Sequence, residues 1–133
     1  MQIKSDATPF YERLGGEEPL RKLVKRFYHH MDTLTQTKAV REMHAKSLKV
    51  SEEKLFMFLS GWMGGPSLYW EKYGHPRLRM RHMPFAIDES ARDQWMLCMQ
   101  HALDDVVDDQ ALKDELMQAL YGVADFMRNQ PEP

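Results

Sequence analysis

The apolar residues of this chain recur at intervals of three and four, the spacing that gathers side chains on one face of an α-helix. The clearest stripe begins near Glu17, directly after the helix-breaking pair Gly15 and Gly16. Tyr28 lies on this stripe, so we expect its hydroxyl to point into the protein, where a buried hydroxyl must find a hydrogen-bond partner. The stripe consists of Leu20, Leu23, Val24, Phe27, Tyr28 and Met31.

Three further stretches carry the same period, from Ser51 to about Met63, from Asp88 to about Val106, and from about Gln110 to about Arg128. Each has one apolar face, so the four helices must pack against one another, and no strand pattern interrupts them. The pattern therefore predicts an all-α fold. The three apolar faces comprise Leu55, Phe58, Leu59, Trp62 and Met63; Ala91 or Gln94, Trp95, Cys98, Met99, Ala102, Leu103 and Val106; and Leu112, Leu116, Ala119, Leu120, Val123 and Met127.

The connection from Gly64 to Asp88 is longer than a helical bundle needs. Within it, Pro76 fits the first position of a short helix. Met83 precedes Pro84 and is expected to end that helix, because the residue before a proline avoids the helical region. A long irregular connection of this kind indicates a segment that covers a bound group, such as a flat cofactor between pairs of helices.

The chemistry of this short helix centres on one imidazole. Leu78 and His82 are four residues apart and share a face, and Arg77, Arg79 and Arg81 flank it. An axial nitrogen, an apolar wall and cations for two propionates are what an iron porphyrin requires. The same three arginines would also suit a solvated turn or a small phosphate-binding patch.

Composition narrows the classes of function. The chain has 133 residues, 43% of them hydrophobic and 29% charged, which predicts one globular domain. The net charge of −2 argues against non-specific nucleic-acid binding, and the single cysteine, Cys98, favours a reducing compartment. No apolar run is long enough to cross a membrane and the N-terminus does not resemble a signal peptide, so a cytoplasmic location is expected.

Several segments together resemble one known family, the truncated haemoglobins, and specifically group II. The resemblance spans roughly Phe10 to Met127 and implies a two-over-two helical sandwich around haem b, with residues 1–9 as an extension, 10–128 as the globin domain and 129–133 as a disordered tail. The segments that carry it are Gly15-Gly16, Phe27-Tyr28, Gly64-Gly65-Pro66, Tyr69, Gly74-His75-Pro76-Arg77-Leu78-Arg79-Met80-Arg81-His82-Met83-Pro84-Phe85, Arg92-Asp93-Gln94-Trp95 and Cys98-Met99.

The resemblance also implies roles for individual residues. His82 corresponds to the iron ligand on the proximal side, and Tyr28 and Trp95 to donors toward the diatomic ligand on the distal side. His44, or Met43 if the register slips by one, takes a place where the family often has Phe or Tyr, and we prefer His44 as a third donor that completes a polar network with Tyr28 and Trp95. The remaining cofactor contacts implied are Ser51, Lys54, Leu55, Phe58, Leu59, Tyr69, His75, Arg77, Leu78, Arg79 and Phe85, with Lys54 and Arg79 the best candidates for the propionates.

These roles predict a haem protein that reversibly binds O2, CO and NO at a five-coordinate iron. Two functions follow from the resemblance: oxygen binding, or removal of reactive nitrogen and oxygen species such as peroxide or peroxynitrite. The chain has no Gly-rich dinucleotide fingerprint, so a redox reaction would need a separate reductase. A monomer or weak dimer is expected. The alternative is a haem-free helical module that binds an acidic or phosphate-bearing partner through Arg77, Arg79 and Arg81.

Overall fold

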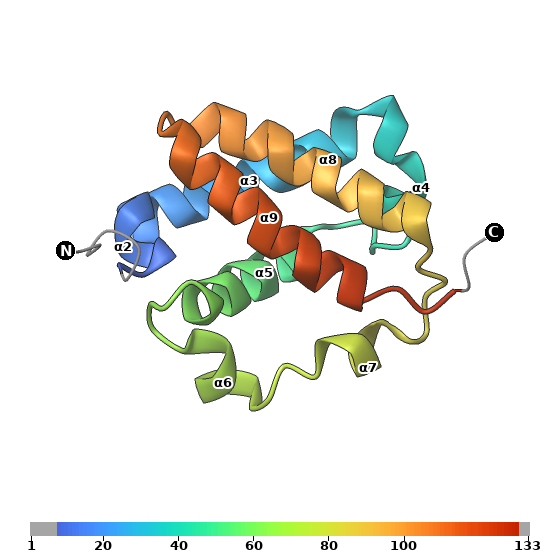
Figure 1. Cartoon of the computed structure of the whole chain (residues 1–133). Helices are drawn as coiled ribbons and strands as arrows, with labels where there is room; N and C mark the ends of the chain where they lie inside the picture. Colours follow the sequence, from blue (N-terminus) through green and yellow to red (C-terminus); the bar gives the residue numbers. More distant parts are fainter. Residues whose placement is uncertain (1–7, 131–133) are drawn as a thin grey trace.

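The computed structural model describes residues 8–130, and every regular element within that range is a helix (Figure 1). The all-α prediction is therefore confirmed. The elements are α2 (Phe10–Leu14), α3 (Glu17–Thr33), the 3-10 turn η1 (Thr35–Thr37), α4 (Lys38–Glu42), α5 (Lys49–Trp62), α6 (Leu68–Tyr73), α7 (Leu78–His82), α8 (Glu89–Val106) and α9 (Gln110–Phe126).

Local sequence signals explain most of the helix ends. Gly15 ends α2 with a φ of 113°, a left-handed conformation that glycine adopts without a steric penalty. Asp88 caps α8 by accepting a hydrogen bond from the Ala91 N–H at 2.8 Å. Asp109 does the same for Leu112 at the start of α9. The predicted start of α3 and the predicted start and end of α8 agree with the structure.

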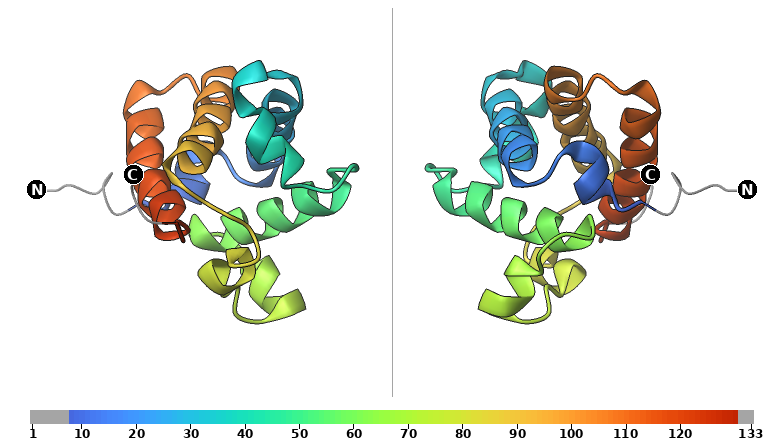
Figure 2. Two further views of the ribbon diagram at one scale, coloured as in Figure 1. Left: turned by 90° about the vertical axis from the view of Figure 1, so that its right-hand side faces the viewer. Right: turned by 90° about the vertical axis from the view of Figure 1, so that its left-hand side faces the viewer.

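The four long helices form two layers. The pair α8 and α9 lies against the pair α3 and α5, with α6 and α7 below α5, as the end-on views show (Figure 2). This arrangement is the predicted two-over-two sandwich. The long connection between α5 and α8 carries α6 and α7 along one side of the molecule, so it covers the lower edge of the sandwich.

The core is built from the predicted stripes, with one informative difference in α5. All six stripe residues of α3 are buried. In α5, by contrast, Phe56 and Met57 are buried, whereas the expected Leu55 and Phe58 are only partly so. The helix is apolar on two faces, one in the core and one toward a cavity described below, and periodicity alone does not distinguish them.

Two predicted helix starts are wrong. α7 begins at Leu78 and not at Pro76, because Arg77 adopts a left-handed conformation (φ 47°, ψ 51°) that interrupts the helix. α5 begins at Lys49, two residues before Ser51, and the Lys49 N–H contacts the hydroxyl of Ser47 at 3.4 Å. Ser51 is therefore inside the helix and does not cap it.

The ends of the chain are described in part. Residues 1–7 of the predicted extension and residues 131–133 of the predicted tail lie outside the described range. Asn129, which the sequence placed in a disordered tail, instead hydrogen-bonds to the segment between α7 and α8. Within residues 8–130, no helix is both long and apolar enough to cross a membrane.

Candidate functional site

A cavity of about 710 Å³ lies between the two layers and the α6–α7 connection. That volume is within the roughly 300–1,000 Å³ usual for small-molecule and cofactor pockets. Three predicted contacts, His75, Arg77 and Arg79, are not part of its wall. The predicted residues that line it are Tyr28, His44, Ser51, Lys54, Leu55, Phe58, Leu59, Tyr69, Leu78, His82, Phe85 and Trp95, together with Met43.

His82 enters the cavity from α7 with its ring orientation defined. Its Nδ1 lies 2.7 Å from the carbonyl oxygen of Leu78, one turn earlier. A carbonyl can only accept, so Nδ1 carries the proton and Nε2 of the neutral ring keeps its lone pair. Nε2 has no hydrogen-bond partner among residues 8–130. A half-buried nitrogen base is thus available in the wall of the cavity.

Tyr28 brings a hydroxyl to the same cavity from α3. Its ring is 7% exposed, and its O–H donates to the backbone carbonyl of Ser51 at 3.3 Å, which is long for such a bond. Burial, and secondarily the nearby carboxylate of Glu52, raises the pKa of Tyr28 far above its ordinary value. The group therefore stays protonated at neutral pH and acts as a hydrogen-bond donor.

Trp95 supplies a second donor from α8. Its indole packs against Phe27 of α3, with ring centroids 4.9 Å apart and a tilt of 58°. Phe27 is fully buried, so the indole is supported by a rigid part of the core. The indole N–H can only donate, and no acceptor within the described residues is bonded to it. A donor without a protein partner at the cavity wall is a position where a ligand would be recognised.

His44 corrects the expectation of a third donor. Gln94 of α8 accepts from the Val40 N–H at 3.0 Å and thereby ties α4 to α8. The Val40 carbonyl then accepts from Nδ1 of His44 at 2.9 Å. Burial lowers the pKa of His44, so the ring is neutral near pH 7 and its Nε2 is an acceptor. The predicted donors are thus reduced to Tyr28 and Trp95, with His44 as a polar acceptor beside them.

Three cationic side chains line the cavity, and two of them have no carboxylate partner in the part of the chain that the structure describes. Arg92 is paired with Asp93 and Asp125 at 2.9 and 2.8 Å. Lys54 and Arg81 have no ion-pair partner among residues 8–130. Arg81 was expected among the three arginines that flank His82, although not among the contacts implied by the resemblance, and its Nε donates to the carbonyl of Pro76 at 2.8 Å.

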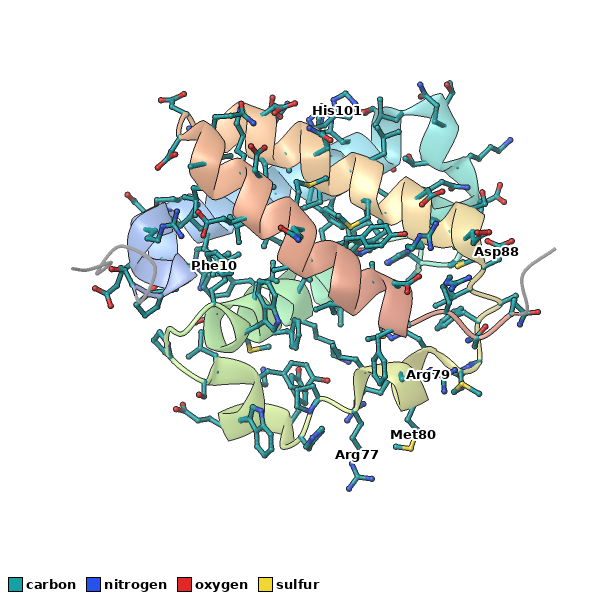
Figure 3. The ribbon with its side chains drawn as sticks, viewed as in Figure 1. Phe10, Arg77, Arg79, Met80, Asp88 and His101 are labelled. Atoms are coloured by element: carbon teal, nitrogen blue, oxygen red, sulfur yellow. The ribbon has the colours of Figure 1, made fainter. Side chains whose placement is uncertain are left out.

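The three arginines around α7 do not form one patch. Arg77 and Met80 point away from the body of the molecule, whereas Arg79 turns toward the end of α9 (Figure 3). Arg79 donates from Nε to the carbonyl of Phe126 and from the guanidinium to that of Arg128, both at 3.1 Å. Arg81 faces the cavity. The phosphate-patch alternative required these cations to converge, and the structure separates them.

His75 also lies apart from the cavity. Its Nδ1 accepts a hydrogen bond from the backbone N–H of Arg77 at 2.9 Å, and its ring lies 4.9 Å from that of Trp70.

Several lining residues were not predicted as contacts, although four of them, Ala91, Leu120, Val123 and Met127, were on predicted apolar stripes. The full set of unpredicted lining residues is Val40, Ala45, Arg81, Ile87, Ala91, Arg92, Leu120, Val123, Ala124 and Met127.

These groups fit a flat apolar cofactor that carries two acidic groups and a metal with a vacant ligand position. Most of the wall is aliphatic and aromatic, with side chains such as Leu55, Phe58, Leu120 and Met127. Nε2 of His82 provides one nitrogen ligand, and Lys54 and Arg81 provide two cations. The unpaired N–H of Trp95 supplies a donor for a small polar ligand. Haem fits this set of groups.

The comparisons with known proteins agree with the fold. A model of the bacterial-like globin family matches residues 9–129. The group 2 truncated hemoglobin YjbI of Bacillus subtilis is 37% identical over 126 residues, which cover 92% of this chain and 89% of that protein.

Solved structures give the same result. A cold-adapted truncated hemoglobin of the Antarctic marine bacterium Pseudoalteromonas haloplanktis superposes with a TM-score of 0.90 at 45% identity, covering 93% of this chain and 100% of the other. A group II 2-on-2 hemoglobin of Agrobacterium tumefaciens superposes with a TM-score of 0.89 at 37% identity, covering 97% and 100%.

Proposed function

We propose, from the premise that this chain belongs to the bacterial-like globin family and is a group II truncated haemoglobin, that it holds haem b through His82 and reversibly binds O2, CO and NO. The family implies haem binding. The observation that carries the proposal is the hydrogen bond from His82 Nδ1 to the Leu78 carbonyl, because it fixes the tautomer of the neutral ring in which Nε2 keeps its lone pair, in a cavity of cofactor size. Bound haem would supply an iron atom that takes up a diatomic gas.

The side chains that line the cavity would hold the cofactor by apolar contacts and by charge. Leu55, Phe58 and Leu78 would provide apolar contacts to the porphyrin and keep water from it. Lys54 and Arg81 would hold the propionates through charge-assisted hydrogen bonds. Arg81 takes the place that the sequence had assigned to Arg79, whose guanidinium is already committed to α9.

On the ligand side, Tyr28 and Trp95 each hold a proton toward the gas. The long bond from Tyr28 to the Ser51 carbonyl is easily exchanged for a better acceptor. Donors already in place stabilise the partial negative charge that dioxygen acquires, at no cost of rearrangement when it binds. The neutral His44 adds no donor near pH 7. We infer that O2 is held tightly and released slowly.

Slow release of O2 favours a reaction of the bound O2 over bulk transport of O2. NO and O2 combine with one electron to give nitrate, and a protein that retains O2 and admits NO promotes this reaction. The electron would come from a separate reductase, because the sequence carries no dinucleotide-binding fingerprint.

Two measurements on the haem-loaded, reduced protein test this proposal. Rapid mixing of the O2 complex with excess CO gives the rate of O2 release, which we expect to be slow and to rise when either donor is removed. Consumption of NO with a supplied reductant then separates the two functions. Consumption of more than one equivalent of NO per haem supports detoxification. Consumption that stops at one equivalent leaves reversible binding as the function.

A further inference from the structure

The helix that carries His82 is short and has no buried side chain. None of the five residues of α7 is buried, and Met80 is 58% exposed. A helix of this length has little intrinsic stability, and most helical stability in proteins comes from the burial of an apolar face. Other contacts must therefore hold α7 in place.

Those contacts come from the last residue of α9, Phe126, and from the segment that follows it. Arg79 donates to the backbone carbonyls of Phe126 and Arg128, and its guanidinium lies 6.0 Å from the centre of the Phe126 ring. Asn129 donates from Nδ2 to the carbonyl of His82 at 3.2 Å and to that of Phe85 at 2.8 Å. In the described part of the chain, every hydrogen bond from α7 to another helix or terminal segment ends within residues 126–129.

All the donors of the Asn129 side-chain amide are engaged in hydrogen bonds, and its oxygen accepts two more. Both Nδ2 protons are donated, and Oδ1 accepts from the Ile87 N–H at 2.9 Å and from the Gln130 amide at 3.2 Å. Its backbone N–H donates to the Ile87 carbonyl at 3.0 Å. A side chain that both donates twice and accepts here must be an amide of this length. Asn129 is the only asparagine in the chain.

We propose that Asn129 is a positioning residue for His82, and that it sets where the imidazole nitrogen stands in the cavity. The ring is tied to the Leu78 carbonyl, and the His82 carbonyl is tied to Asn129, so both ends of the residue are held. The Phe85 N–H also bonds to the His82 carbonyl at 3.0 Å and closes the turn that Asn129 spans. This inference rests on the proposed role of His82 as the iron ligand.

Two variants separate this role from simple attachment of the chain end. Asn129→Asp keeps an oxygen to accept from Ile87 but loses both donors to α7 and the turn after it. Asn129→Ala loses all of these side-chain bonds. Gln118→Ala is the control, because Gln118 is exposed on α9 and its amide has no hydrogen-bond partner among the described residues.

The readouts are the iron–histidine stretching band of the reduced protein in resonance Raman spectra and the rate of haem transfer to an excess of apomyoglobin. Circular dichroism first establishes that each variant is helical. We expect both Asn129 variants to shift the band and to lose haem roughly tenfold faster, as the loss of one or two net hydrogen bonds implies. Gln118→Ala should match the parent.

The remaining outcomes contradict the inference in different ways. If Asn129→Asp retains the parental band and rate while Asn129→Ala does not, Asn129 serves only to anchor Ile87, and the positioning role is refuted. If both variants behave as the parent, Asn129 has no influence on His82. If the parent itself takes up no haem, the proposed function fails and this inference fails with it. Should Asn129→Ala be unfolded, the Asn129→Asp result decides alone.

Discussion

Tyr28 and His44 meet edge to face at the cavity, with ring centroids 5.9 Å apart. The first is a protonated hydroxyl and the second a neutral imidazole whose Nδ1 is already engaged with Val40. A donor and an acceptor therefore stand side by side where the gas would bind. The donors that remain for a ligand are Tyr28 and Trp95, and this assignment leads to the first prediction.

Removing either donor should speed O2 release. We expect Tyr28→Phe and Trp95→Phe each to raise the release rate several-fold to roughly tenfold, because one hydrogen bond to a partly charged acceptor is lost. Stopped-flow displacement by CO measures the rate. Tyr121→Phe on the exposed side of α9 is the matched control. Parental release rates in both Tyr28→Phe and Trp95→Phe would show that these donors do not retain the ligand.

Two neighbouring lysines allow a direct test of the propionate contacts. The amines of Lys54 and Lys72 lie over the same ring, that of Tyr73, at 5.2 and 5.5 Å, but only Lys54 lines the cavity. Lys54→Met should accelerate haem loss several-fold at low salt, whereas Lys72→Met should not. The difference should shrink as salt screens the charge. Equal effects of the two substitutions would exclude a specific role of Lys54.

The lowered pKa of His44 predicts an acid-sensitive contribution to stability. The folded protein binds this proton less readily than the unfolded chain, so stability declines as pH falls below the ordinary value of 6.5. His44→Phe keeps a ring and removes the titration. We expect its melting temperature to fall less than that of the parent between pH about 7.5 and pH about 5.5. An identical fall in both proteins would contradict the burial of a neutral imidazole.

Replacement of glycine by alanine should have opposite effects on the free energy of unfolding at two positions. A Cβ added at Gly65 would lie 2.5 Å from Cδ1 of Tyr11, so Gly65→Ala should destabilise the fold by about 1–3 kcal/mol. At Gly122, within α9, a Cβ meets nothing within 4 Å, and Gly122→Ala should stabilise by up to about 1 kcal/mol. Denaturant unfolding measures both. A Gly65→Ala protein as stable as the parent would refute the packing of Tyr11 on Gly65, and a destabilised Gly122→Ala protein would refute the open space at Gly122.

Much of the fold could be read from the sequence because its signals are local. The α3 stripe, the glycine after α2 and the aspartate before α8 each act within a few residues of their own position. The resemblance added the family, and it placed His82, Tyr28 and Trp95 in one cavity.

The structure differs from the sequence-based predictions where segments far apart in the sequence contact one another. Arg79 and Arg81 look alike in sequence, yet the carbonyls that end α9 draw Arg79 out of the cavity, and Arg81 remains in its wall. Asn129 follows the last helix as any tail residue would, and its partners near His82 are more than forty positions earlier. The left-handed conformation of Arg77 likewise has no signal in its residue type. Periodicity and caps do not report such contacts.

The account rests most directly on His82 as the ligand of haem iron, and absorption spectra test it. Ferric, reduced and reduced CO-saturated spectra of the haem-supplied protein would be recorded beside those of His82→Ala, with His75→Ala as a control outside the cavity. We predict a strong Soret band that shifts with CO in the parent and in His75→Ala, and that is lost or markedly altered in His82→Ala. A folded, helical parent without a Soret band, or a His82→Ala protein with parental spectra, would contradict the assignment.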